Sequence, residues 1–497
     1  MKILLLYPKF PDTFWGFKYA LPFIGKKAAF PPMGLLTVAA LLPRDWEKKL
    51  VDLNLRNPTT EDLKWADFIF VSAMVIQKDS VREIVNLAKK FGKKIVAGGP
   101  LFATGYEEFL GDIDHFVLGE AESLLPLFLE DLKNGSLKKI YKTNQWPDIR
   151  KTPVPLWELI NIKKYAQMGI QYSRGCPFNC EFCDIVLLNG RMPRAKDKDQ
   201  ILKELDALYD RGWRDSVFFV DDNFIGNKIK LKQEILPAII KWMEEKKYPF
   251  VFNTQASINI ADDEELMELM AKAGFNSVFV GIESPDEEVL KECGKFQNTN
   301  RNLLESIKAI QNHGLQVSAG FIIGFDKDAP SIFDQMYLFI QKSGIATAMV
   351  GLLQAASKTR LWERLKAEKR LVAQYAGTGS NTDCTINFIP KMNLQSLISG
   401  YKRVINQLYS PKNYYQRMVI FFREYKPKIK RKRRLNFNHL FAFLKSIWIL
   451  GIREKERLYY WKIFFRCLFK NPKLFPLAIE MMVKGYHFRK VSEEYLK

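Results

Sequence analysis

Short apolar runs alternate with stretches of helical period over the first part of the chain. The apolar runs cover residues 2–7, 49–53, 68–72, 94–97 and 115–118. A helical pattern lies between the first two runs, at residues 33–42. This alternation predicts βαβ units and a parallel, doubly wound sheet, a Rossmann-like domain that we expect over residues 1–135. Ligands bind such sheets at the carboxyl ends of the strands.

The residues at these strand ends are small, polar or turn-forming. They are Asp52, Asn54, Ser72, Gly98, Gly99, Gly119 and Glu120. Ordinary loop chemistry favours the same residue types. From the pattern alone, the edge is therefore either a ligand-binding surface or a set of plain turns.

A second alternating series follows a Pro- and Lys-rich stretch, residues 136–165, which is typical of a linker. The series extends over residues 166–370. Its expected strands are residues 169–173, 216–220, 251–255, 277–281, 316–323 and 347–353. Six strands with helices between them predict an incomplete parallel barrel, a partial (β/α)6 fold, with function again at the carboxyl ends of the strands.

The alternation ends near residue 370, and we expect residues 371–497 to form a mostly α domain that is rich in aromatic and basic residues. The fold class is therefore α/β with a helical carboxyl-terminal domain. The formal net charge is +21, and the chain from residue 401 onward holds 24 Lys and Arg against six Glu. Such a surface suits a partner that carries dense negative charge.

The cysteines do not form a disulfide framework. Three of the six lie within eight residues, and the other three are isolated. Residues 1–7 lack the basic flank and small-residue cleavage site of a signal peptide. We therefore expect a protein of the reducing cytoplasm.

One loop carries the candidate chemistry. Cys176, Cys180 and Cys183 form a C-x3-C-x2-C triplet directly after the first barrel strand. Three thiolates in one loop can hold three irons of a [4Fe-4S] cluster and leave the fourth iron open. A structural zinc ion would want a fourth protein ligand, which no nearby His or Cys supplies. A disulfide would leave one thiol unpaired.

This triplet, with the aromatic Phe182 before its last cysteine, resembles the signature of the radical SAM superfamily. The resemblance implies that the open iron binds S-adenosylmethionine (SAM), which an electron from the cluster splits to a 5′-deoxyadenosyl radical. It also implies SAM contacts at the ends of the following strands. The candidates are Asp222, Asn223, Gln255, Glu283 and Ser284. Taken one by one, such residues are more often helix caps or turn residues.

The doubly wound sheet followed by this barrel is similar to the cobalamin-dependent radical SAM class. The usual motif of that class, D-x-H-x-x-G, supplies a histidine to cobalt. The corresponding stretch here has Asp52 followed by Asn54 in place of the histidine, and it lacks the glycine as well. The resemblance therefore implies cobalamin bound base-off and His-off.

Four further segments resemble the subfamily that includes the hopanoid C-2 methylase and the bacteriochlorophyllide methylases. They are residues 30–40, 96–100, 360–365 and 387–392. This implies a C-methyltransferase that acts on an unactivated carbon of a hydrophobic small molecule, lipid or tetrapyrrole-like, with a flavodoxin or ferredoxin as electron donor. An unactivated C–H bond has no acidic proton, so the cofactors must begin the reaction.

Two other functions remain open from the sequence. The same machinery could catalyse cyclisation, coupling or oxidation without methyl transfer. A cobalamin or redox sensor without turnover is the non-enzymatic alternative, although a sensor needs no open iron.

The basic, aromatic tail has three interpretations. Aromatic residues interleaved with Lys and Arg, including the run at residues 430–434, are typical of a peripheral contact with an anionic membrane, at its inner face for a cytoplasmic protein. The same residues could form the core and solvated surface of a helical domain. Nucleic acid is the third possible partner, but nothing resembles an RNA-binding module.

Overall fold

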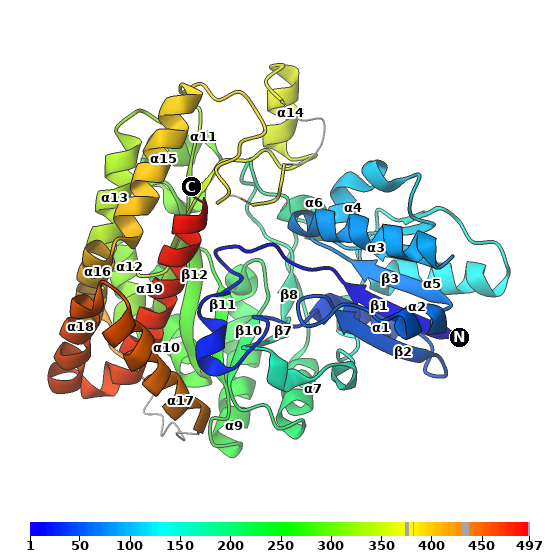
Figure 1. Ribbon diagram of the computed structural model, residues 1–497, viewed down its shortest axis with the longest axis horizontal. Coiled ribbons are helices and arrows are strands. Elements are labelled where there is room, and N and C mark those ends of the chain that lie inside the picture. Colours follow the sequence, from blue (N-terminus) through cyan, green and yellow to red (C-terminus); the bar gives the residue numbers. More distant parts are fainter. Residues whose placement is uncertain (373–376, 381, 429–436, 496–497) are drawn as a thin grey trace.

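The computed structural model describes residues 1–372, 377–380, 382–428 and 437–495 (Figure 1). The first region is one parallel six-stranded sheet with strand order β2-β1-β3-β4-β5-β6. Its strands are β1 Lys2–Tyr7, β2 Glu47–Asp52, β3 Phe68–Ser72, β4 Lys94–Gly98, β5 His115–Leu118 and β6 Ile140–Lys142. Its helices are α1 Met33–Leu41, α2 Thr60–Trp65, α3 Lys78–Lys90, α4 Pro100–Gly105 and α5 Ala121–Lys133.

The central strands of this sheet are buried on both faces, as their continuous apolar sequences require. Ile3 and Leu5 pack against α1 and α5, whereas Leu4 and Leu6 pack into the cluster on the side of α2, α3 and α4. The expected strands are confirmed to within two residues. The sheet also gains β6 from the stretch expected as a linker.

The second region is the partial barrel, a parallel sheet with strand order β7-β10-β11-β12-β13-β14. Its strands are β7 Met168–Ile170, β10 Ser216–Phe219, β11 Val251–Gln255, β12 Phe275–Glu283, β13 Gln316–Ile323 and β14 Ala348–Leu352. A short hairpin, β8 Ser173–Arg174 and β9 Arg194–Ala195, follows β7. The helices are α6 Ile185–Asn189, α7 Lys198–Asp210, α8 Lys228–Lys230, α9 Leu236–Glu245, α10 Glu264–Ala273, α11 Glu287–Glu292, α12 Leu303–Asn312 and α13 Ile332–Ser343.

The third region is helical and packs on the last barrel strands and α13 (Figure 1). Its elements are α14 Arg360–Ala367, α15 Leu394–Tyr409, α16 Pro411–Glu424, α17 Phe437–Ser446, the π-helix η11 Ile447–Arg453, α18 Arg457–Lys470 and α19 Phe475–Tyr495. The hydroxyls of Tyr401 and Tyr409 donate to the carbonyls of Val350 and Ala348, at 3.1 and 2.5 Å. These bonds cover the edge of β14, which is the outermost strand of this sheet among the described residues.

Spanning a membrane would need a helix longer and more apolar than any within the described ranges. The basic run at residues 430–434 lies outside those ranges.

A segment between β1 and α1, residues 8–32, crosses from the first region to the other two (Figure 1). We call it the strap. Phe14 of the strap stacks on Phe488 of α19, with ring centroids 4.1 Å apart. The buried ring of His487 accepts from the backbone N–H of Tyr19 at Nδ1, and its Nε2 lies 3.0 Å from the Phe14 carbonyl. His487 is therefore neutral, with its proton on Nε2.

We expect this histidine to make stability depend on pH. Burial lowers the pKa of His487 from 6.5 to about 4, because a second ring proton would oppose the Tyr19 N–H. Between pH 4 and 6.5 the unfolded chain binds more protons at this residue than the folded protein does. The contribution of His487 to the free energy of unfolding is therefore complete above pH 6.5 and is lost as the pH falls toward 4. The loss should approach about 3 kcal/mol. Urea unfolding at pH 7 and pH 5 should show the stability gap between wild type and His487→Gln narrowing at the lower pH, and a constant gap would contradict this assignment.

Candidate active site

The three cysteines lie on a loop between β8 and α6, residues 175–184, which we call the cysteine loop. Gly175 starts it with a φ of +98°, and a Cβ there would lie 2.9 Å from the carbonyl oxygens of Gly190 and Met192. Only glycine fits this close approach without strain. The Cys176 N–H then donates to the Gly190 carbonyl at 3.2 Å. The chain after the loop thus fixes where the triplet begins.

All three thiols are free. Burial raises the pKa of Cys176, and it raises that of Cys183 to about 12. Cys180 lies close enough to both to raise their pKa values further. No three His, Cys, Asp or Glu side chains of the described residues surround one point as ligands of a single ion. Three neighbouring thiols on one loop fit the donor set of a [4Fe-4S] cluster, whose thiolates each bind a different iron.

Two adjacent aspartates hold the base of the cysteine loop. The buried carboxylate of Asp221 accepts from the Tyr172 N–H at 3.0 Å and from the Ser173 hydroxyl at 2.6 Å. Burial raises its pKa to about 7. Asp222 accepts from the Gly175 N–H at 3.3 Å and from the Asn189 amide at 2.8 Å. The acids at the end of β10 therefore position the triplet.

A buried lysine lies on another side of the triplet. Lys295 pairs with Glu283 at 2.8 Å, and both side chains are about nine-tenths buried. Burial opposes the charge of Lys295, but the Glu283 carboxylate and the nearby Cys180 raise the pKa of Lys295 above its usual value. Its positive charge therefore lies beside the thiols. The Gln297 amide, 3.8 Å from the sulfur of Cys180, lies on the same segment.

The remaining candidates for SAM contact lie at the strand ends where they were expected. Glu283 ends β12 with a φ of +65°, where the pairing with β13 shifts register. The buried hydroxyl of Ser284 accepts from the Asp286 N–H. Asn223 accepts from the Ser257 N–H at 3.1 Å, and Gln255 is the last residue of β11, half-buried. Phe182 packs on Phe325, with centroids 5.9 Å apart.

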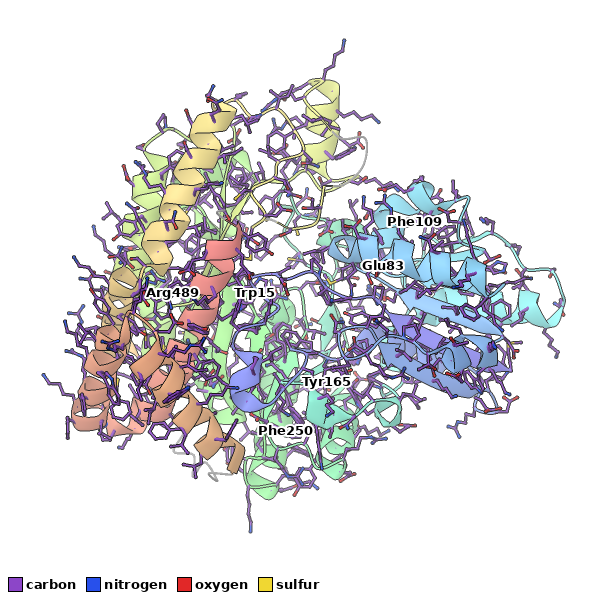
Figure 2. All side chains as sticks on the ribbon, in the orientation of Figure 1. Trp15, Glu83, Phe109, Tyr165, Phe250 and Arg489 are labelled. Atoms are coloured by element: carbon purple, nitrogen blue, oxygen red, sulfur yellow. The ribbon has the colours of Figure 1, made fainter. Side chains whose placement is uncertain are left out.

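The carboxyl edge of the first sheet combines a satisfied acid with very small residues. Asp52 is buried and accepts from the side chain of Asn54 at 2.7 Å and from the Tyr165 hydroxyl at 2.9 Å. Figure 2 shows Tyr165 between the barrel and the first region. Asn54 also accepts from the Phe10 N–H at 2.9 Å, so both polar groups of its amide have protein partners.

Glycine is required along the same edge. Gly99 has a φ of +93°, and a Cβ on it would lie 2.6 Å from the Ser72 hydroxyl and 3.1 Å from the Ala73 N. A Cβ on Gly98 would lie 3.2 Å from the Val117 carbonyl, and Gly119 has a φ of +147°. These positions leave backbone rather than bulky side chains at the sheet edge. Such an edge fits a broad ligand at the strand ends.

A buried charge network joins this edge to the cysteine loop. Arg174, directly before Gly175, pairs with Glu120 at 2.5 Å and with Glu122 at 2.8 Å. Arg194 pairs with Glu120 as well. Burial alone would raise the pKa of Glu122, but the Arg174 guanidinium lowers it. Because Glu120 lies just after β5 and Arg174 just before the triplet, the two candidate cofactor surfaces face each other.

The inner face of the barrel is aromatic. Phe279 is half-buried, whereas its neighbours Val278 and Val280 are buried beneath the helices, so Phe279 points inward. Trp15 of the strap lies 5.5 Å from Phe279 between ring centroids, and its Nε1 donates to the sulfur of Met349 at 3.0 Å. Figure 2 shows Trp15 beside the barrel strands. Phe30 of the strap meets Phe218 in the same way. Together these side chains form the inner wall.

Sequence reasoning did not find Lys295, the Arg174 network or the inner wall. Arg174 lies two residues before the first cysteine, and this position was the one available signal. Lys295 is a single lysine in a polar stretch, and Trp15 lies 334 residues from Met349. The periodic spacing of apolar residues along the chain carries no information on contacts between distant segments.

We expect the Arg174 network to stabilise the joint between the two regions. Glu120→Gln should lower the free energy of unfolding by about 3 kcal/mol, because it leaves the buried Arg194 without its carboxylate partner and Arg174 with Glu122 alone. Arg211→Gln is the matched control, since its partner Glu158 is exposed, and it should cost at most about 1 kcal/mol. Urea unfolding followed by circular dichroism measures both. Equal losses in the two variants would show that the network contributes no more than a surface pair.

Known family models match three parts of the chain. The B12 binding domain matches residues 27–129, the Radical SAM superfamily matches residues 170–340, and a domain of unknown function (DUF4070) matches residues 359–497. These matches coincide with the three regions of the fold.

Two solved structures share the fold. The cobalamin-dependent S-adenosylmethionine radical enzyme OxsB superposes with a TM-score of 0.64 at 14% identity, over 100% of this chain and 79% of that one. The radical S-adenosylmethionine methyltransferase TsrM from Kitasatospora setae gives 0.62 at 14% identity, with full coverage of both chains.

Relatives of known sequence cover nearly the whole chain. An uncharacterized methyltransferase of Synechocystis sp. is 42% identical over 99% of this chain and 92% of its own length. The hopanoid C-2 methylase of Rhodopseudomonas palustris is 35% identical over 95% and 90%. A bacteriochlorophyllide d C-12(1)-methyltransferase of Chlorobaculum tepidum is 26% identical over 68% and 74%. The chain therefore belongs to the family of cobalamin-dependent radical SAM methyltransferases.

Proposed function

We propose that this enzyme methylates an unactivated carbon of a hydrophobic small molecule, a polycyclic lipid or a tetrapyrrole-like compound. The observation that carries the proposal is the Arg174 network, because it holds the cysteine loop opposite the small-residue edge of the first sheet. The aromatic inner wall then offers an apolar surface inside the barrel. Relatives that methylate hopanoids and bacteriochlorophyllides support this substrate class.

The proposed cluster ligands are Cys176, Cys180 and Cys183. When bound, the cluster and SAM supply the radical that removes hydrogen from carbon, and the cobalamin supplies the methyl group. Lys295 places a positive charge near these thiolates, which offsets part of their negative charge in a buried site. Asp222 sets the position of the loop through the Gly175 N–H.

The SAM contacts that we propose come from the carboxyl ends of the barrel strands. They are Phe182, Asp222, Asn223, Gln255, Glu283 and Ser284. Gln255 is half-buried at the carboxyl end of β11. Glu283 and Asn223 already have protein partners, so they hold the walls of the site in place.

The proposed cobalamin surface is the edge formed by Asp52, Asn54, Ser72, Gly98, Gly99, Gly119 and Glu120. We propose the base-off, His-off form, because Asn54 takes the place of the usual histidine and its amide is bonded to Asp52 and Phe10. A flavodoxin or ferredoxin would supply the electron. The proposed setting is the cytoplasm, at the inner face of the membrane, where an apolar substrate is found.

The test of function is anaerobic turnover. Reconstituted enzyme with SAM, methylcobalamin and a reductant should convert a component of a lipid extract into a product one methyl group heavier, detected by mass spectrometry. Cys176→Ala, Cys180→Ala and Cys183→Ala should each lose the cluster absorbance and all SAM cleavage, because each thiolate holds a different iron. Cys467→Ala is the control, since Cys467 is buried in the helical region away from the loop. SAM cleavage by any of the three loop variants would refute the ligand assignment.

The axial ligation of cobalt is tested by paramagnetic resonance. The Co(II) form should lack nitrogen superhyperfine splitting from a lower imidazole, because the protein offers Asn54 at that position. Asn54→His tests the same point in reverse, since a histidine there could introduce the splitting. A nitrogen triplet in the wild-type spectrum would contradict the His-off proposal.

A further inference from the structure

A helical hairpin near the carboxyl end exposes a row of large apolar side chains. Helix α17 continues directly into η11, and along this unit exposed residues recur every four positions. A spacing of three or four places residues on one face of a helix. Each is 50 to 61% exposed: Leu440, Phe441, Leu444, Trp448 and Ile452.

The second helix of the hairpin, α18, carries a matching row. Leu458 and Phe469 are 70 and 76% exposed. Trp461, Phe465 and Phe469 stack along the helix, with centroids 5.6 and 6.1 Å apart. The two rows meet at η11, because the indole N–H of Trp461 donates to the Gly451 carbonyl at 2.9 Å. We call α17, η11 and α18 the docking hairpin.

The surroundings of these rows are strongly basic. Residues 440–473 contain eight Lys and Arg but only two Glu. Both glutamates are already paired within the fold, Glu454 and Glu456 each with Arg489. The basic side chains are nearly all exposed: Arg453, Lys455, Arg457, Lys462, Arg466, Lys470 and Lys473. The free charge of this surface is therefore positive.

The exposed apolar rows and the basic side chains around them together favour one kind of binding partner. Neighbouring exposed apolar side chains bordered by charged residues mark an interaction site. A second copy of the same face would bring eight basic side chains against eight. A nucleic acid would pair with the charges but would leave leucine and isoleucine side chains uncovered. An anionic lipid surface satisfies both, because acyl chains receive the apolar side chains and phosphates receive the Lys and Arg.

We propose that the docking hairpin inserts its apolar rows into an anionic membrane surface. The hairpin lies at the outer end of the molecule, remote from the first region (Figure 1). Its own core side chains, among them Ser446, Leu450, Tyr460 and Ile463, face the protein. The exposed rows are thus free for lipid while the hairpin stays attached to the fold.

The docking hairpin also contacts the strap. Helix α17 packs on the short turn Leu21–Ile24 of the strap, and the Lys445 ammonium donates to the Pro22 carbonyl at 3.0 Å. The same strap carries Trp15 to the inner wall. One segment therefore connects the docking hairpin to the inner wall of the barrel. This connection bears on substrate delivery only if the proposed function holds, whereas the docking does not depend on it.

The test is sedimentation of the reconstituted holoenzyme with vesicles of phosphatidylcholine alone or with added phosphatidylglycerol. The wild-type enzyme should bind the anionic vesicles. Part of this binding should persist at high salt, because salt screens the charges but not the apolar insertion. Lys462→Gln with Arg466→Gln should weaken this binding roughly 25-fold at low salt, since each charge near the surface contributes a factor of about five. Lys90→Gln with Lys133→Gln removes two exposed charges from α3 and α5 of the remote first region, so this double variant is the matched control and should change nothing.

The contribution of apolar insertion is tested with the double variant Trp448→Ala and Phe469→Ala. This pair should remove the binding that resists high salt, whereas Leu338→Ala, at an exposed leucine on α13 outside the hairpin, should keep it. Circular dichroism first establishes that each variant is folded. Equal binding by the pair and the control would overturn the proposal. So would a folded wild type that ignores anionic vesicles, self-associates through this face or binds RNA in preference to lipid.

Turnover of a detergent-solubilised substrate separates this proposal from the proposed function. The hairpin variants should methylate such a substrate as wild type does, because no hairpin residue belongs to the cysteine loop or the inner wall. If the enzyme binds vesicles but methylates nothing, the proposed function is refuted while the proposed docking surface stands.

Discussion

The barrel sheet is left open, and the arrangement of the whole molecule depends on how its last strand is covered. An unpaired strand edge exposes a row of hydrogen-bonding groups that must find other partners. Here Tyr401 and Tyr409 supply hydroxyls to the carbonyls of β14. Helix α15, which carries both tyrosines, therefore shares one hydrophobic core with the barrel. The helical region, whose family model has no assigned function, is in structural terms the missing wall of the barrel.

The active site shows a second constraint, which is the balance of buried charge. Buried carboxylates and guanidinium groups are costly unless each is paired. Arg174 and Arg194 pair with Glu120 and Glu122 between the regions, and Lys295 pairs with Glu283 beside the thiols. The charge pairs thus fix the position of the cysteine loop relative to the first sheet. Apolar packing alone is not directional and would allow these two sides of the site to shift against each other. The aromatic inner wall, by contrast, sets shape and polarity but carries no charge.

Much of this architecture follows from local pattern. The strands were predictable because buried parallel strands are continuous apolar runs, and the cysteine triplet because its spacing is specific. Contacts between distant segments were not predictable. Nothing in the sequence near Trp15 indicates that its side chain reaches Met349. Asp221 and Asp222 are the same residue type at adjacent positions, yet Asp221 accepts from the Tyr172 N–H and Asp222 from the Gly175 N–H. The exposure of the Leu440 row also needed the fold, because the same apolar spacing is typical of a buried helix face.

The strap has a consequence for biosynthesis. It leaves the ribosome early, but Phe488 and His487 follow more than 470 residues later. Until α19 emerges, Phe14 lacks the ring on which it stacks, and the Tyr19 N–H lacks the histidine to which it donates. During most of translation the nascent chain must therefore carry an uncovered aromatic segment, which is the kind of sequence that chaperones bind. A premature stop before α19 would release a chain whose strap lacks these contacts, and such a fragment should aggregate rather than form a shorter enzyme.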